Sequence, residues 1–353
     1  MREKTRQVMV GSVPIGGGAP ITVQSMANTD TRDAAATLAQ IGALSEAGCD
    51  IVRVAVPDQA AAEALFTLVK KSPVPLVADI HFDYRLALKA LEAGIHKLRL
   101  NPGNIGDERK VREVVRAAEE RRVPIRIGVN SGSVPRHLLE RHGRTATAMV
   151  ESALEHVAIF ERLGFYDIVI SVKATDIDLT IQAYEELSRR VPYPLHVGIT
   201  EAGTKWFGTI KSAAGLGALL SRGIGDTLRV SLTADPVEEV KVGWAILSAM
   251  DLRRRGPVFI SCPTCGRTEI DLEGIAQEVE NRLGDFPLPI TIAIMGCVVN
   301  GPGEGSHADL GICGGKGVGM IFRRGEIVRR VPEEELVDAL VAEANRLLEK
   351  DRG

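Results

Sequence analysis

The sequence has few aromatic residues and no excess charge of either sign. Aromatic residues make up 4% of its 353 residues, and 43 basic residues stand against 46 acidic ones, for a net charge of −3. Without a basic excess, nothing points to binding of nucleic acid or a membrane surface. We expect neither as a partner, and any anion site must come from a local arrangement of cations.

Targeting and membrane-spanning segments are also missing. No apolar run reaches the length of about 18 residues that a transmembrane helix needs. The start of the chain, "MREKTRQVMVGSVPIGG", has neither the apolar centre nor the cleavage site of a secretory signal. We therefore expect a cytoplasmic protein.

Cysteines are few, and their number is odd. They are Cys49, Cys262, Cys265, Cys297 and Cys313. An odd count in a long cytoplasmic chain argues against a disulfide framework and favours metal ligation or catalysis. Four of the five lie in the last hundred residues, so we expect the thiol chemistry there. Cys49, in "AGCDIV", is typical of a small buried residue.

Between residue 20 and about residue 250, strand-like and helix-like patterns alternate. Each β-branched run is followed by an amphipathic stretch with apolar residues three or four positions apart. The strand-like runs are 21–26, 50–57, 75–82, 96–102, 124–130, 167–174, 194–203 and 226–236. Eight such units predict a (β/α)8 TIM barrel over residues 1–254. The alternative is an open doubly wound sheet, but no "GxGxxG" opens the first helix.

The alternation stops at "RRRGP", which is typical of a linker. Beyond it we expect a strand near 258–262, a helix at 270–283 and a strand at 289–297. A strand pair at 317–331 and a helix at 332–350 follow. The stretch 296–317 is rich in glycine and is expected to be a long irregular loop with a function. Together these patterns predict a small α+β domain over residues 255–353.

In five predicted barrel strands, a cation stands among apolar residues near the carboxyl end. Barrel enzymes place their active sites at the carboxyl ends of the strands, and isolated buried cations are costly unless they are paired. The five are Arg53, Arg99, Arg126, Lys173 and Arg229. One interpretation pairs each with a barrel carboxylate, but Asp79 and Glu201 are too few. The other is a ring of cations around a polyanion such as a small diphosphate.

Other polar residues lie near the same strand ends. Asn130 and Ser231 are placed to contribute hydrogen bonds to a ligand. Glu201, in "ITEAG", is either a general acid or base or a partner of one cation, and we favour catalysis. His81 and His196 have the same options, although a lone strand histidine is more often a core residue.

In the second domain, "CPTC" places two thiols on one turn, where they can meet the same metal centre. Cys297 supplies a third thiol, and either Cys313 or Glu304 supplies a fourth ligand. Three kinds of site remain open: a structural zinc site, an iron–sulfur cluster and a thioredoxin-like redox pair. The redox pair is the weakest, because its βαβ context is missing.

Six motifs, spread over almost the whole chain, are similar to those of one enzyme family. They are "VQSMANTDTRD", "LRLNPGN", "ITEAG", "LRVSLTADP", "SCPTCGR" and "MGCVVNGPGE". Taken together, they closely resemble the 4-hydroxy-3-methylbut-2-enyl diphosphate synthases of the non-mevalonate isoprenoid pathway. The uninterrupted barrel pattern resembles the bacterial short form.

The resemblance implies a function and a cofactor. The substrate would be 2-C-methyl-D-erythritol 2,4-cyclodiphosphate, opened by two-electron reduction with loss of a hydroxyl as water. One 4Fe–4S cluster would be bound by Cys262, Cys265, Cys297 and Glu304, with the glutamate as the replaceable ligand. Ferredoxin or flavodoxin would supply electrons, and Glu201 is our candidate proton donor. The family also implies a homodimer in which the cluster domain of one subunit closes over the barrel mouth of the other.

Overall fold

The computed structural model describes residues 2–100, 108–297, 305–315 and 317–351. By contacts the chain divides into two compact units, Met1–Arg253 and Arg254–Gly353. No helix in the described ranges is both long and apolar enough to cross a membrane.

The first unit is a parallel barrel, which confirms the predicted fold class. Its strands are β3 (Thr22–Met26), β4 (Ile51–Ala55), β5 (Leu76–Asp79), β6 (Lys97–Leu100), β7 (Ile125–Asn130), β8 (Ile168–Lys173), β9 (His196–Val197) and β10 (Thr227–Leu228). They pair in parallel from β8 through β3 to β10 and β9. A parallel bridge between Ile170 and Leu195 joins β8 to β9 and closes the ring. The open-sheet alternative was wrong.

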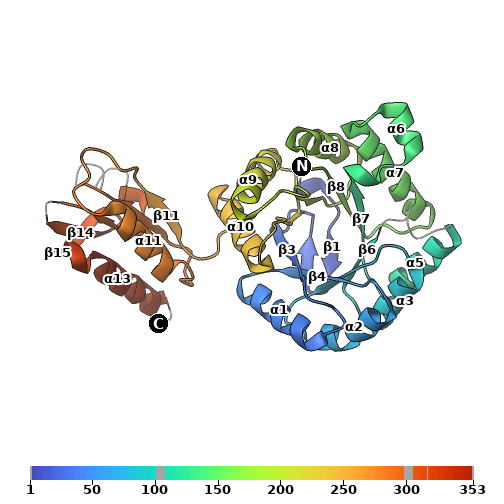
Figure 1. Cartoon of the computed structure of the whole chain (residues 1–353), viewed down its shortest axis with the longest axis horizontal. Helices are drawn as coiled ribbons and strands as arrows, with labels where there is room; N and C mark the ends of the chain where they lie inside the picture. The colour runs from blue at the N-terminus through green and yellow to red at the C-terminus, as the bar shows by residue number, and fades with distance from the viewer. Residues whose placement is uncertain (1, 101–107, 298–304, 316, 352–353) are drawn as a thin grey trace. The chain divides into compact units, whose positions relative to one another are not determined.

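Helices surround these strands (Figure 1). They are α1 (Ala34–Glu46), α2 (Gln59–Lys71), α3 (Tyr84–Glu92), α5 (Glu108–Glu120), α6 (Arg136–His142), α7 (Ala146–Arg162), α8 (Ile177–Arg190), α9 (Lys205–Ser221) and α10 (Pro236–Ala249). Aspartates begin several of them, because a carboxylate satisfies free amide groups in the first turn. Asp33, for example, accepts hydrogen bonds from the amides of Ala35 and Ala36.

Two features of the barrel differ from the sequence prediction. An antiparallel hairpin of β1 (Val8–Val10) and β2 (Val13–Ile15) precedes the barrel, and its Val10 and Ile15 pack with Ile51 and Val77. Its strands are too short for periodicity to reveal. Strands β9 and β10 also have only two residues each, far fewer than their patterns suggested. At Gly198, directly after β9, a Cβ would lie 2.5 Å from the carbonyl oxygen of Arg229, so the backbones are already in close contact there.

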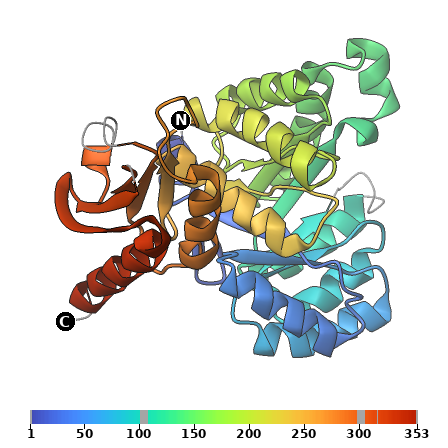
Figure 2. The same cartoon turned by 60° about the vertical axis from the view of Figure 1, so that its left-hand side comes forward.

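The second unit is an α+β domain, as predicted. Its five strands are β11 (Val258–Ser261), β12 (Thr291–Met295), β13 (Leu310–Cys313), β14 (Val318–Arg323) and β15 (Glu326–Pro332). The first three run parallel, and β13, β14 and β15 pair antiparallel. Helices α11 (Leu272–Leu283) and α13 (Leu336–Asp351) pack together in one apolar core with the sheet (Figures 1 and 2).

The expectation of an irregular loop over residues 296–317 was wrong in part. Strand β13 lies within that stretch and forms the centre of the sheet, between β12 and β14. Its four residues, "LGIC", are all buried. A run of four residues beside so many glycines is too short to stand out as a strand, and its partners supply the hydrogen bonds that define it.

Candidate active site

Three of the predicted cations are held by two buried carboxylates. Asp79, at the end of β5, lies 3.0 Å from Arg99 Nη1 and 3.6 Å from Arg53 Nε. Glu239, on α10, accepts hydrogen bonds of 3.2 Å from both Nε and Nη2 of Arg229. The paired-cation interpretation therefore holds for these three arginines.

Among the described residues, the other two predicted cations have no carboxylate partner. Arg126 donates a 2.6 Å hydrogen bond to the hydroxyl of Ser171, and its Nε is buried without a partner. Lys173 is 8% exposed and has no hydrogen-bond or ion-pair partner in the described part of the chain. These two groups are placed for a ligand that brings its own negative charge.

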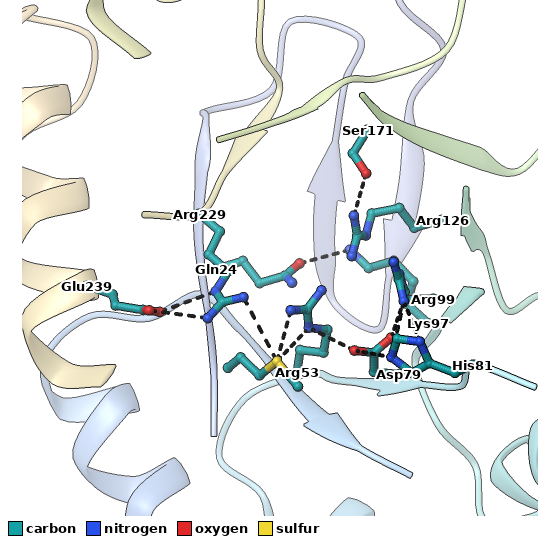
Figure 3. Close-up of polar contacts among 11 residues, drawn as sticks. Gln24, Arg53, Asp79, His81, Lys97, Arg99, Arg126, Ser171, Arg229 and Glu239 are labelled. Atoms are coloured by element: carbon teal, nitrogen blue, oxygen red, sulfur yellow. Dashed lines mark hydrogen bonds and ion pairs between the residues drawn. The ribbon is translucent and has the colours of Figure 1, made fainter. Parts of the chain in front are cut away.

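The close-up in Figure 3 shows the arginines of this group converging from their strands. The Met26 sulfur lies between Arg53 and Arg229: it accepts from Arg53 Nε at 3.1 Å and from Arg229 Nη1 at 3.9 Å. A thioether is a weak acceptor that carries no charge. It orients the two guanidinium groups without neutralising them.

Burial and the mutual repulsion of the cations change the pKa values of several residues at this site. Burial lowers the pKa of Arg53 to about 10, and burial together with Arg53 and Arg99 lowers that of Arg126. Burial, Arg126 and Arg229 hold the pKa of Lys173 well below its ordinary value. Burial alone would raise the pKa of Asp79, but Arg53, His81 and Arg99 hold it below the ordinary range. The group attracts anions strongly.

Glu201 lies apart from these ion pairs. Its carboxylate accepts a 3.0 Å hydrogen bond from the Thr175 hydroxyl, and no cation among the described residues pairs with it. An ion pair between Glu201 and one of the cations, the alternative to catalysis, is therefore not found among the described residues. Its backbone φ is +52°, a left-handed conformation that residues other than glycine adopt rarely and often at functional sites.

The remaining strand-end residues have different surroundings. Asn130 is exposed at the end of β7, and Ser231 is half-buried two residues after Arg229. His81 is mostly exposed, with Nε2 3.5 Å from Asp79. His196 is fully buried, and neither ring nitrogen has a hydrogen-bond partner in the ranges that the structure describes. Burial and the nearby cations Lys173 and Arg126 lower its pKa well below the ordinary value, so this ring is neutral.

In the second unit, three thiols share one edge of the sheet. Cys262 directly follows β11, Cys297 follows β12 by two residues, and Cys313 ends β13. Because these strands are parallel, their carboxyl ends meet at the same edge. The amide of Gly296 donates a 3.2 Å hydrogen bond to the Cys262 sulfur. One backbone N–H donor and three thiols therefore lie at the same edge of the sheet.

The other thiols differ in exposure. Cys265 is exposed, and hydrogen bonds from the backbone and side chain of Arg267 lower its pKa. Cys313 is buried, and burial together with the nearby Cys297 raises its pKa. Glu304 lies outside the described residues. Within them, no three histidine, cysteine, aspartate or glutamate side chains gather closely enough to hold one metal ion.

Comparison with known proteins places this geometry in a family. Residues 5–244 match the model of the GcpE TIM-barrel domain, and residues 258–346 match that of the GcpE protein C-terminal domain. The chain belongs to the GcpE family. The resemblance noted in the sequence motifs is thereby confirmed.

Curated GcpE relatives are similar over nearly their full length. A protein of Geobacter sulfurreducens is 63% identical over 99% of this chain and 99% of its own. One of Maridesulfovibrio salexigens is 60% identical over 100% of this chain and 99% of its own. Both are named 4-hydroxy-3-methylbut-2-en-1-yl diphosphate synthase (flavodoxin).

Solved structures of other enzymes are similar to the GcpE chain in fold alone. Dihydropteroate synthase of Yersinia pestis has a TM-score of 0.50 at 13% identity, over 69% of this chain and 98% of its own. N-acetylneuraminic acid synthetase of Leptospira borgpetersenii also has a TM-score of 0.50 at 13% identity, over 70% and 90%. At this identity the likeness carries no information on chemistry.

Two residues of the GcpE site escaped the sequence analysis. Glu239 lies on a helix, and an acidic residue in a helical pattern is ordinarily predicted to face the solvent. In the structure it is buried and forms an ion pair with Arg229. Lys97 lies two positions before Arg99 on β6, and its side chain is fully buried. The one signal in the sequence was the spacing, because residues two apart on a strand point to the same face.

Proposed function

We propose that this protein reduces 2-C-methyl-D-erythritol 2,4-cyclodiphosphate to 4-hydroxy-3-methylbut-2-en-1-yl diphosphate in isoprenoid biosynthesis. The reaction takes two electrons, opens the ring and releases one hydroxyl as water. The observation that carries the proposal is the surplus of cations over carboxylates inside a GcpE barrel. The names of the relatives suggest flavodoxin as the electron donor, with ferredoxin as the alternative.

The residues of the barrel would bind and orient the diphosphate. Arg126 and Lys173 have no carboxylate partner among the described residues, so both would donate hydrogen bonds to the phosphates, and Arg126 would supply positive charge. Three other side chains are already held in place by Asp79, Glu239 and Met26: those of Arg53, Arg99 and Arg229. These arginines would therefore lose little conformational entropy when the ligand binds. Asn130 and Ser231 would add hydrogen bonds to phosphate oxygens. Preorganised donors in a site with little water are effective because they need no rearrangement.

Glu201 would hold the proton for the departing hydroxyl. It follows β9 at the carboxyl end of the barrel, where catalytic residues of this fold lie. The hydroxyl of Thr175 fixes one carboxylate oxygen, which leaves the other to face a ligand. Protonation makes the hydroxyl a better leaving group.

The cofactor would be a 4Fe–4S cluster bound by Cys262, Cys265, Cys297 and Glu304. The donor chemistry fits, since three of these residues are thiols and the backbone N–H of Gly296 already points at one sulfur. When bound, such a cluster supplies single electrons and an iron that acts as a Lewis acid. A carboxylate is a harder ligand for iron than a thiolate, so Glu304 would be the ligand that leaves most readily.

The proposal includes a cytoplasmic homodimer. In the family form, the cluster domain of one subunit would close over the barrel mouth of the other, so that each site would use both chains. A cytoplasmic setting keeps the thiols reduced for ligation. Measurement of the solution mass, with mixed dimers of barrel and cluster variants, tests this part.

Anaerobic purification followed by a turnover assay tests the whole proposal. We expect about four irons per chain, broad absorption near about 400 nm, and conversion of the cyclodiphosphate when reduced flavodoxin is supplied. Glu304→Cys should keep the cluster and lose turnover, whereas Cys313→Ser, the matched control at the other possible ligand, should keep both. A colourless protein with one zinc would instead indicate a phosphate-binding barrel without redox chemistry.

A further inference from the structure

A sixth cation, Lys97, lies in the barrel interior beside the five that the sequence indicated. Lys97 is 0% exposed to solvent. The ammonium nitrogen lies 3.3 Å from Gln24 Oε1, and within the described residues it has no other hydrogen-bond or ion-pair partner. A buried ammonium group held by one neutral amide is costly, because no carboxylate replaces the water it has lost.

The charged groups around Lys97 increase this cost. Arg126 on β7 and Arg53 on β4 are the cations that act on it, and together with burial they hold its pKa well below the ordinary value for lysine. The carboxylates of the group are engaged elsewhere: Asp79 with Arg53 and Arg99, and Glu239 with Arg229. Burial, a single neutral hydrogen-bond partner and two nearby arginines therefore all favour the neutral amine of Lys97 in the ligand-free protein.

Other titratable groups in the same interior do not change this assignment. His196 on β9 is neutral for the same reason, and Lys97 is one of the cations that lower its pKa. Arginine stays charged under all ordinary conditions. Lys173 on β8 also has a lowered pKa, so it is a second group able to change protonation when a ligand arrives.

We propose that Lys97 is a positioning residue that takes up one proton from solvent when the diphosphate binds. Negative charge brought to Arg53 and Arg126 relieves the repulsion that keeps Lys97 neutral, and the new ammonium group adds to the attraction. Gln24 accepts the hydrogen bond from Lys97 through Oε1, and its buried Nε2 has no partner in the described part of the chain (Figure 3). The inference rests on the proposed function for the chemical class of the ligand.

The cyclic diphosphate is a suitable probe because it does not itself titrate near neutral pH. Each phosphorus carries one ester and one anhydride linkage, which leaves a single, strongly acidic oxygen on each. Protons exchanged on binding therefore come from the protein. The affinity should fall as the pH rises, by up to about tenfold per pH unit, because the proton that must be taken up becomes scarcer.

Calorimetric titration of the oxidised, cluster-loaded protein with the cyclodiphosphate tests the proposal. Without a reductant there is no turnover. Repeating the titration at pH 8 in buffers of different ionisation enthalpy gives the number of protons taken up. We expect Lys97→Met to take up about one proton fewer than the wild type, with a weaker dependence of affinity on pH. Lys97→Gln, which keeps a hydrogen bond to Gln24, is the second variant and should give the same result.

Lys173→Arg is the matched control. It keeps a permanent positive charge at the other lysine, so the uptake by Lys97 should persist. Equal proton uptake in the wild type and both Lys97 variants would overturn the proposal, as would loss of uptake in Lys173→Arg alone. Binding without any proton uptake would leave the proposed function standing and refute this inference. If the wild type did not bind the cyclodiphosphate, both would fail.

Discussion

Replacing Glu239 by glutamine removes one negative charge from the interior of the site and turns one of two acceptor oxygens into an amide donor. The carboxylate is 4% exposed and accepts hydrogen bonds from Arg229, from the Ser25 hydroxyl at 2.9 Å and from the Leu232 amide at 3.0 Å. Glutamine has the same shape and keeps one acceptor oxygen. The variant therefore removes the charge that compensates Arg229 together with one acceptor of its hydrogen bonds.

The expected loss of stability follows from this geometry. Removing one partner of a buried ion pair ordinarily costs about 3–5 kcal/mol, because the other charge stays buried and unpaired. The side chain of Arg229 is 18% exposed and keeps one hydrogen bond in the variant, so we expect about 2–3 kcal/mol less unfolding free energy. Saturating cyclodiphosphate should reduce this difference, since its phosphates would replace the missing charge.

Urea denaturation of the wild type and variant, with and without ligand, measures both effects. Glu238→Gln is the control on the same helix: its carboxylate pairs with Lys205 nearer the surface, and its loss should change the stability by less than about 1 kcal/mol. In an Arg229→Met background, Glu239→Gln should cost much less. The reasoning is refuted if Glu239→Gln is as stable as Glu238→Gln, or if its effect is the same with and without Arg229.

Three further substitutions test other parts of the site. Gly198→Ala should lower the unfolding free energy by about 1–3 kcal/mol, because its Cβ would lie 2.5 Å from the carbonyl oxygen of Arg229. The control is Gly42→Ala, whose Cβ meets no atom within 4 Å and which should not lower the unfolding free energy. Equal stability of the two variants in urea denaturation would contradict the close contact. Glu201→Gln should lower kcat by about 10²–10⁴-fold with little change in KM in steady-state assays, and an unchanged kcat would remove it from the proton-transfer step. Lys97→Met should stabilise the ligand-free protein at pH 7, because it removes a buried amine whose protonated form no carboxylate among the described residues offsets. The unfolded wild type binds more protons than the folded wild type, so the stability of the wild type rises with pH. The stability difference between Lys97→Met and the wild type should therefore vanish at about pH 10. A series of melting temperatures measured at different pH values tests this.

The barrel could be predicted because its signals are local. Apolar runs alternate with amphipathic stretches, and helix-opening residues such as Asp33 and Asp235 satisfy amide groups in their own first turns. The cations also followed from a local rule, since strand ends in this fold meet at one face. Their positions on separate strands were enough to bring Arg53 and Arg99 to one carboxylate.

The missed residues depend on contacts that no local pattern encodes. Glu239 becomes part of the site because α10 packs against β3 and brings the carboxylate to Ser25 and Arg229. Lys97 resembles an ordinary charged residue at the start of a strand, and its burial is evident only in the closed barrel. Strand β13 is similarly defined by its neighbours, because four residues have too few contacts to signal a strand by themselves.

In the part of the chain that the structure describes, some cations of the site pair with carboxylates and others do not, so the stability of the fold and the binding of ligand depend on different residues. Mutations of an active site usually change these two properties together. Arg53, Arg99 and Arg229 support the folded state through Asp79 and Glu239, so their loss disturbs architecture and binding at once. Arg126 and Lys173 have no such structural duty towards a carboxylate. Substituting Arg126 or Lys173 should therefore give a well-folded protein with impaired ligand binding. Such a variant can serve as the reference sample that separates the effects of the ligand on spectra or crystals from the effects of damage to the fold.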